Sequence, residues 1–197
     1  MKSRRDANVE ATRTALLAAA RKHFARDGYS KSEIGRIVAD AGVTTGAVYH
    51  HFSGKKALFQ AVAEKLEHEI LAASAVDGES PLRRLRNGFE RLVETCAAND
   101  IQRIIFVEAP QVIGPEAWRE IELRYAFGAL HEILGALRKA NAIKPYPTEL
   151  VARMLLALLR ESSAELARAK SAQNARKQVF DLISSVFDAL LVPSASR

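Results

Sequence analysis

The chain has 197 residues, of which 48% are hydrophobic and 26% charged, and its net charge is +6 at pH 7. This length is sufficient for one ordinary domain or two small ones, and the composition excludes a disordered chain. Charges interrupt every apolar run before the ~20 residues that a membrane span needs, and no apolar core of a signal peptide is visible. The single Cys96 excludes an internal disulfide. We therefore expect a cytoplasmic protein without membrane contact.

Four helices are predicted in the first part of the chain. Apolar residues at three- and four-residue steps predict a first helix that ends at Gly28. Ser32 is expected to cap a short second helix that Gly42 closes, and Thr44 to cap a short third one. A long fourth helix is expected from Ser53 to about residue 74.

The remainder of the chain is also predicted to be helical. Ser80 and Pro81 suit the cap and first position of a helix that runs to Cys96. Further helices are expected over 101–109, stopped by Pro110, and over 115–140, from Thr148 onward and over 179–191. No segment alternates with the period of two that a strand requires, so the predicted fold class is all-α.

The positive charge is concentrated at one end of the sequence. Residues 1–56 contain eleven Lys or Arg and five Asp or Glu, whereas residues 57–197 contain 18 of each sign. This asymmetry predicts a basic domain over 1–56, suited to a polyanion, and a neutral domain over 57–197. A merely solubilising basic surface is the alternative explanation.

The second and third predicted helices form the pattern of a helix-turn-helix motif. They are joined by a tight turn over residues 41–44, in which Gly42 permits the positive φ that a sharp turn requires. In such a motif the second helix enters the major groove of DNA and leads with its N-terminal residues. By itself this spacing is a weak signal, because many helical proteins contain similar corners.

The residues around this turn make the signal specific. The stretch AGVTTGAVYHHF over 41–52, with GYSKS before it and SGKKAL after it, resembles the DNA-binding signature of TetR-family transcriptional regulators. The resemblance covers roughly residues 9–66. It implies a three-helix DNA-binding module followed by a helical bundle that dimerises and holds a small effector ligand.

The resemblance also implies roles for individual residues. Hydroxyl groups of Thr44 and Thr45 would contact phosphates or base edges, and Gly46 would allow close approach of the helix to DNA. Lys55 would bind a phosphate from the start of the fourth helix, and Arg4 and Arg5 could reach a minor groove. The residues assigned to DNA binding are Ser32, Thr44, Thr45, Gly46, Tyr49, His50 and Lys55.

An effector pocket is expected in the C-terminal domain, by analogy with the family. Such a cavity needs apolar walls and a few polar groups that orient the ligand, which we expect to be apolar or amphipathic. Aromatic residues on helices more often belong to the core, and this alternative stays open. The assigned pocket residues are Phe106, Glu108, Trp118, Tyr125, His131 and Arg160.

The last two predicted helices are apolar over wider faces than one core-facing stripe requires. In a twofold dimer they would pack as a four-helix interface, and two recognition helices would then read a palindromic operator. The alternative is that both faces are buried within one chain. The assigned interface residues are Leu155, Leu158, Leu159, Ile183, Val186, Phe187 and Leu190.

Enzyme chemistry has no candidate centre in this sequence. Adjacent His50 and His51 point about 100° apart on a helix and chelate poorly, and no phosphate loop, zinc-protease motif or nucleophile elbow occurs. We therefore expect no enzyme activity, metal or cofactor. The predicted function is a homodimeric, ligand-responsive transcriptional regulator, a repressor that its effector releases from DNA. The alternatives are a ligand-independent DNA-organising protein and a helical small-molecule-binding protein or enzyme.

Overall fold

The computed structural model describes residues 4–75 and 80–192, and these residues are predominantly helical. A single isolated antiparallel bridge joins Ile143 to Leu191, so the all-α prediction is confirmed. The described part of the chain contains no helix long and apolar enough to cross a membrane. In chain order the helices are α1 (Arg4–Lys31), α2 (Ile34–Asp40), α3 (Thr45–His51), α4 (Lys55–Ala73), α5 (Pro81–Cys96), α6 (Asn99–Ile101), η1 (Gln102–Glu108), α7 (Ala109–Ile113), α8 (Pro115–Glu122), η2 (Leu123–Phe127), α9 (Gly128–Lys139), α10 (Thr148–Arg168) and α11 (Ala172–Leu190).

The chain divides into two compact units that are not continuous in sequence. The first unit comprises Met1–Leu66 and Asn99–Arg119, and the second comprises Glu67–Ala98 and Glu120–Arg197. The predicted boundary at residue 56 concerns binding function rather than packing, and it stays a prediction.

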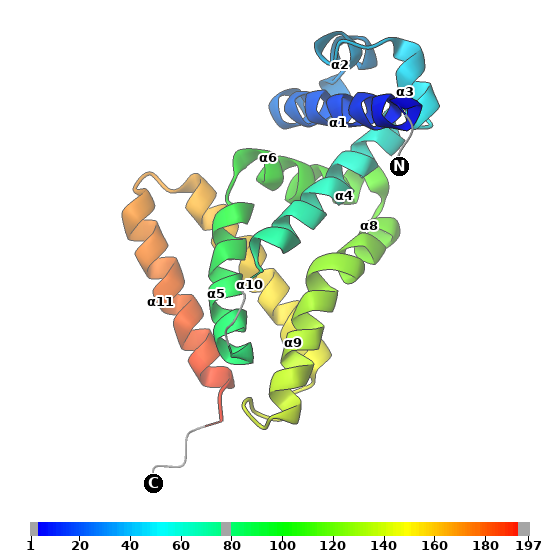
Figure 1. The fold of residues 1–197 in the computed structure, drawn as a ribbon. Helices are drawn as coiled ribbons and strands as arrows, with labels where there is room; N and C mark the ends of the chain where they lie inside the picture. The colour runs from blue at the N-terminus through cyan, green and yellow to red at the C-terminus, as the bar shows by residue number, and fades with distance from the viewer. Residues whose placement is uncertain (1–3, 76–79, 193–197) are drawn as a thin grey trace. The chain divides into compact units, whose positions relative to one another are not determined.

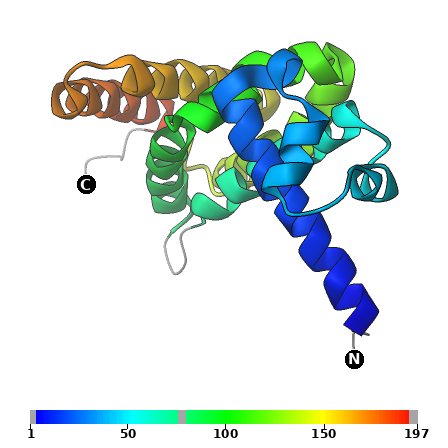
Figure 2. The same cartoon turned by 90° about the horizontal axis from the view of Figure 1, so that it is seen from above.

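The first unit is assembled around α1. Helices α2 and α3, and the later segments α6 and η1, all pack against α1 (Figure 1). Figure 2 shows that the N-terminal turns of α1 project away from α2. The core includes Phe24 and Phe59, whose rings meet edge to face with centroids 5.0 Å apart. This contact joins α1 to α4, whereas α2 and α3, which are too short to be stable alone, depend on their own buried residues Ile37, Val38 and Val48.

The second unit is a bundle of α5, α9, α10 and α11. Helix α10 packs against each of the other three, and α5 lies between α9 and α11 in Figure 1. Phe89 of α5 and Phe187 of α11 are both buried, with ring centroids 5.3 Å apart. Cys96 is buried at the end of α5, where the predicted helix ends, and it is part of the core.

The predicted break at Gly28 and the predicted cap at Ser80 are found in the structure, whereas the predicted helix end at Pro110 is not. The helical φ and ψ angles of α1 are interrupted at Gly28, where φ is +81°, and Ser80 accepts a hydrogen bond from the Arg83 N–H as the cap of α5. The prediction that Pro110 ends a helix is wrong, because the helix continues to Ile113. Pro110 lies in the first turn of α7, directly after the π-helical η1, where a backbone N–H needs no intrahelical partner.

Candidate nucleic-acid interface

The helix-turn-helix is held by a buried face on each of its two short helices. Ile37 and Val38 of α2 and Val48 of α3 are at most 6% exposed. Gly42 has the predicted positive φ of +67°, and the Val43 N–H donates to the Val38 carbonyl at 3.0 Å. The chain can therefore reverse sharply between α2 and α3. With Val48 turned inward, the opposite face of α3 is left at the surface.

That outer face of α3 carries most of the residues predicted to bind DNA. Thr44, Thr45, Gly46, Tyr49 and His50 are all exposed, and Tyr49 is 62% exposed. Thr44 occupies the cap position of α3 as predicted, but its side chain makes no capping hydrogen bond. A side chain at position 46 would approach only the Thr44 hydroxyl, at 3.7 Å, so Gly46 is open to an approaching molecule.

Ser32 does not fulfil its prediction. It is 1% exposed, and its hydroxyl donates to the Gly28 carbonyl at 2.7 Å instead of capping α2, whose cap position is Glu33. The Ser32 N–H also donates to the Gly28 carbonyl, at 3.2 Å, so the last turn of α1 brings both groups of Ser32 to this oxygen. A buried, bonded hydroxyl offers no surface to a phosphate, so we leave Ser32 out of the interface.

Lys55 lies at the start of α4 as predicted, and its ammonium group is held by residues at the end of α1. The Nζ atom donates to the Ser30 carbonyl at 3.3 Å and lies 4.5 Å from the centre of the Tyr29 ring. Partial burial lowers the pKa of Lys55, while the carboxylates of Glu108 and Glu33 oppose that effect. The ammonium group therefore has a fixed position, which a mobile surface lysine lacks.

A hollow of about 350 Å³ lies between the first turns of α1 and one side of α3, from Thr44 to His51. Its polar lining on the α1 side comes from Asn8 and Thr12, and on the α3 side from Thr44 and His50. Asn8 and Thr12 were not among the predicted site residues. Their i,i+4 spacing places them on one helix face, and this spacing was visible in the sequence. The side chains of Arg4 and Arg5 lie outside the described part of the structure.

The residues predicted to line an effector pocket are divided between the two units. Phe106, Glu108 and Trp118 belong to the first unit, whereas Tyr125, His131 and Arg160 belong to the second. Trp118 is 3% exposed and is a core residue, and Glu108 bonds to the backbone of α1. His131 and Arg160 are exposed, and His131 stacks on Phe127 with ring centroids 5.8 Å apart.

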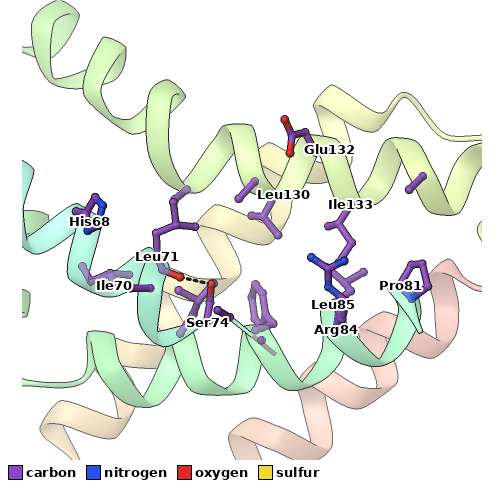
Figure 3. A pocket seen from close by; sticks show the side chains of 18 residues that line it. His68, Ile70, Leu71, Ser74, Pro81, Arg84, Leu85, Leu130, Glu132 and Ile133 are labelled. Atoms are coloured by element: carbon purple, nitrogen blue, oxygen red, sulfur yellow. Dashed lines mark hydrogen bonds between the residues drawn. The ribbon is translucent and has the colours of Figure 1, made fainter. Parts of the chain in front are cut away.

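A cavity of about 550 Å³ does lie within the second unit, in a different place (Figure 3). Its walls come from the end of α4, from α5 and from α9 with the adjoining end of η2. Most of the lining is apolar, including Leu85, Phe89 and Leu130. Figure 3 shows the Arg84 guanidinium beside Ile133, in the space between α5 and α9, while the Glu132 carboxylate points away from that space. None of the six predicted pocket residues lines this cavity.

The predicted dimer residues fall into two groups. Leu155, Leu159, Ile183 and Phe187 are at most 4% exposed and belong to the core of their own chain, so they have little surface left for a partner. Leu158, Val186 and Leu190 are half-buried. Sequence reasoning missed three more exposed apolar side chains: Leu150 and Met154 on α10, and Leu182 on α11.

The part of the chain that the structure describes contains no candidate metal site. No cluster of three or more His, Cys, Asp or Glu side chains occurs there with suitable geometry. The rings of His50 and His51 meet edge to face, 5.2 Å apart, in contact with each other rather than converging on a shared point.

Two family models match the chain. The model for bacterial regulatory proteins of the tetR family matches residues 16–62, which include α2, α3 and the start of α4. The model for the tetracyclin repressor-like C-terminal domain matches residues 82–190. Together they cover the whole of the helix-turn-helix and nearly all of the second unit's helices.

Characterised relatives are similar over most of their length. The Transposon Tn10 TetC protein of Escherichia coli is 28% identical over 156 residues, which cover 78% of this chain and 79% of the relative. The HTH-type transcriptional repressor BepR of Brucella suis is 29% identical over 170 residues, with coverage of 79% and 80%.

Solved structures share the fold. A TetR-family transcriptional regulator from Pectobacterium atrosepticum superposes with a TM-score of 0.70 at 26% identity, covering 97% of this chain and 98% of its own. A protein described as a TetR-family transcriptional regulator from Syntrophomonas wolfei reaches a TM-score of 0.77 at 19% identity, covering 94% and 99%.

Proposed function

Because the chain belongs to the tetR family of bacterial regulatory proteins and is thus a DNA-binding transcriptional regulator, we propose that it represses transcription as a cytoplasmic homodimer, bound to a palindromic operator until a small-molecule effector releases it. The family is one of transcriptional regulators rather than of enzymes.

The exposed outer face of α3 carries this proposal. It presents Thr45, Gly46, Tyr49 and His50 to solvent, next to a hollow lined by Asn8 and Thr12. The face belongs to a sequence segment, residues 1–56, that contains the entire net charge of the chain. A short helix with small and hydroxyl-bearing residues at its start fits a major groove, and the surrounding positive charge attracts the phosphate backbone.

The proposed dimer interface uses the apolar side chains that the single chain leaves exposed. Leu150, Met154 and Leu158 follow one another at four-residue steps along α10, and Leu182, Val186 and Leu190 do so along α11. Met154 is 64% exposed and Leu182 59%. Each helix thus has an exposed apolar stripe beside its buried one, and such stripes are stabilised when a second copy covers them.

The proposed effector site is the cavity between α4, α5 and α9. Its volume of about 550 Å³ lies within the range of small-molecule sites. Its apolar walls suit a hydrocarbon or aromatic body, and Arg84 provides a positive charge directed into the space between α5 and α9 (Figure 3). We therefore propose an amphipathic effector with an anionic group. Release from DNA requires that the effector prefer a dimer geometry that fits the operator poorly.

Selection of bound sequences from a random duplex pool tests the proposal most directly. We expect an inverted repeat to be enriched, and the selected duplex to be bound at least ~10³-fold more tightly than random duplex at physiological salt. Tyr49→Ala should lose most of this preference, while Tyr146→Ala, which alters an exposed tyrosine of the second unit, should retain it. Enrichment without symmetry, or equal binding of all duplexes, would contradict the operator model and favour a DNA-organising protein.

A further inference from the structure

The end of α1 is held by two side chains from a distant part of the sequence. Arg103 of η1 donates from Nη1 to the carbonyls of Ala25 and Arg26, at 3.2 and 2.8 Å. These carbonyls belong to the last turn before the break at Gly28, where a helix has no backbone donors of its own to satisfy them. A guanidinium group at this position neutralises the negative end of the helix dipole.

Glu108, at the other end of η1, completes the arrangement. Its Oε2 accepts a hydrogen bond from the Tyr29 N–H at 2.8 Å, and its Oε1 accepts one from the Arg103 Nε at 3.4 Å. The Glu108 side chain is only 16% exposed, so these bonds are shielded from water. We call Arg103 and Glu108 the η1 clasp.

Gly28 is the residue that makes room for the η1 clasp. A Cβ atom at this position would lie 2.5 Å from Glu108 Oε1 and 2.6 Å from Arg103 Nη2. The positive φ of +81° also disfavours any other residue. The turn at the end of α1 and the side chains of η1 therefore fit each other closely.

The turn held by the η1 clasp is the same turn that holds Lys55. The Tyr29 ring faces the Lys55 ammonium at 4.5 Å, and the Ser30 carbonyl accepts its hydrogen bond. Tyr29 is thus bonded through its N–H to Glu108 and through its ring to Lys55. A displacement of the turn would move the ammonium group with it.

We propose that Arg103 and Glu108 are positioning residues for DNA binding, which fix the turn over residues 28–30 and through it set the place of Lys55 at a phosphate. The inference depends on the proposed DNA contact of Lys55. It assigns a role in DNA binding to residues that lie outside the helix-turn-helix and touch no DNA themselves.

The direction in which DNA affinity changes when Glu108 is replaced distinguishes a positioning role from a purely electrostatic effect. Removal of a carboxylate near a DNA-binding lysine should strengthen binding if only charge matters. If Glu108 acts as a positioning residue, Glu108→Ala should instead weaken operator binding, by about fivefold to twentyfold. The slope of log Kd against log salt concentration should also decrease by about 0.9 for each subunit, because Lys55 no longer engages its phosphate. Glu149→Ala removes an equally negative, exposed side chain of α10 and should change neither quantity.

The decisive measurement repeats these titrations in a Lys55→Ala background. There the positioning role predicts little further effect of Glu108→Ala, since the residue acts through Lys55. Thermal unfolding of every variant checks the fold, and Glu108→Leu, which has a similar volume but offers no acceptor to the Tyr29 N–H, replaces Glu108→Ala if the latter does not fold. Unchanged or tighter binding by the Glu108 variant, or an equal loss with and without Lys55, would overturn the inference. Failure of the parent protein to bind any duplex would overturn the proposed function itself.

Discussion

His23 of α1 and Asp40 of α2 are joined by a short contact, with His23 Nε2 and Asp40 Oδ2 2.7 Å apart. His23 is 3% exposed, and its other ring nitrogen lies 3.3 Å from Arg26 Nη2. Asp40 is the last residue of α2, immediately before the turn that leads to α3. This contact thus fastens the end of α2 to α1 and helps to set the direction in which α3 begins.

We expect Asp40→Ala to reduce the free energy of unfolding by about 1–3 kcal/mol, because a buried imidazole nitrogen would be left without its partner. Urea denaturation measures the change. Asp181→Ala, an exposed carboxylate of α11, should stay within about 0.5 kcal/mol of the parent. Equal stability of the two variants would show that the His23 contact contributes little to the fold.

Stability should also depend on pH through Glu67. This α4 carboxyl is 4% exposed, and its pKa is raised to about 7, first by burial and then by the nearby carboxylate of Glu122. Glu67 also acts on the Cys96 thiol: burial, and after it the Glu67 carboxylate, raises the pKa of Cys96 to about 12. In the unfolded chain the Glu67 carboxyl titrates near 4.5, so the folded protein binds the additional proton between about pH 4.5 and 7.

Because the folded state binds more protons in this window, the Glu67 contribution to stability falls as pH rises from about 4.5 to 7, and is constant above that. Glu67→Gln should remove this slope. The variant should exceed the parent in stability by up to about 3 kcal/mol at pH 8 and equal it near pH 4. Urea denaturation at the two pH values tests the sign, with Glu161→Gln as an exposed control. The buried-carboxyl explanation would be contradicted if the free energy of unfolding of the parent rose, relative to that of Glu67→Gln, as the pH increased from about 4.5 to 7.

A charge placed on the exposed apolar stripe should separate the proposed dimer. We expect Leu182→Glu to shift the protein to a monomer in sedimentation experiments, because the carboxylate would be buried against the partner helix. Operator affinity should fall at least ~100-fold, since a monomer contacts only one half-site. Leu123→Glu alters an exposed leucine on η2 and should leave both quantities unchanged. A Leu182→Glu dimer of normal affinity would exclude this surface as the interface.

Two neighbouring arginines provide a matched test of the effector cavity. Arg84 lines the cavity, whereas Arg83 is exposed and does not. Binding of an apolar anion such as 1-anilinonaphthalene-8-sulfonate should weaken about tenfold in Arg84→Ala and remain unchanged in Arg83→Ala, as followed by fluorescence titration. Ala129→Phe should weaken binding in a different way, by occupying the space between α5 and α9. If the probe binds all three variants like the parent, it occupies another site.

Sequence patterns that act over a few residues predicted the local structure well. Gly28 and Gly42 adopt positive φ at the two expected helix ends, and Ser80 caps α5 as its neighbours suggested. Such features depend on backbone sterics and on the nearest turn of helix, so the information for them is contained in the adjacent residues. The family resemblance, rather than periodicity, implied that Tyr49 contacts DNA, and the residue is indeed exposed.

Predictions that required knowledge of distant neighbours were less successful. Apolar stripes showed that Leu155 and Ile183 are hydrophobic positions, but not whether their own chain or a partner covers them. Ser32 has the residue type of a cap, yet its hydroxyl bonds to the Gly28 carbonyl. In both cases a second segment or a competing partner decided the outcome, and periodicity carries no information on either.

The amino-acid order was therefore enough to predict an all-helical chain and a basic helix-turn-helix, because these depend on short-range sterics and on charge. Folding decided where the cavity lies, which apolar side chains remain exposed, and that Glu108 meets the Tyr29 N–H across 79 positions of sequence. Contacts of that kind form only when whole helices pack, and packing selects partners by shape over the complete surface of each helix.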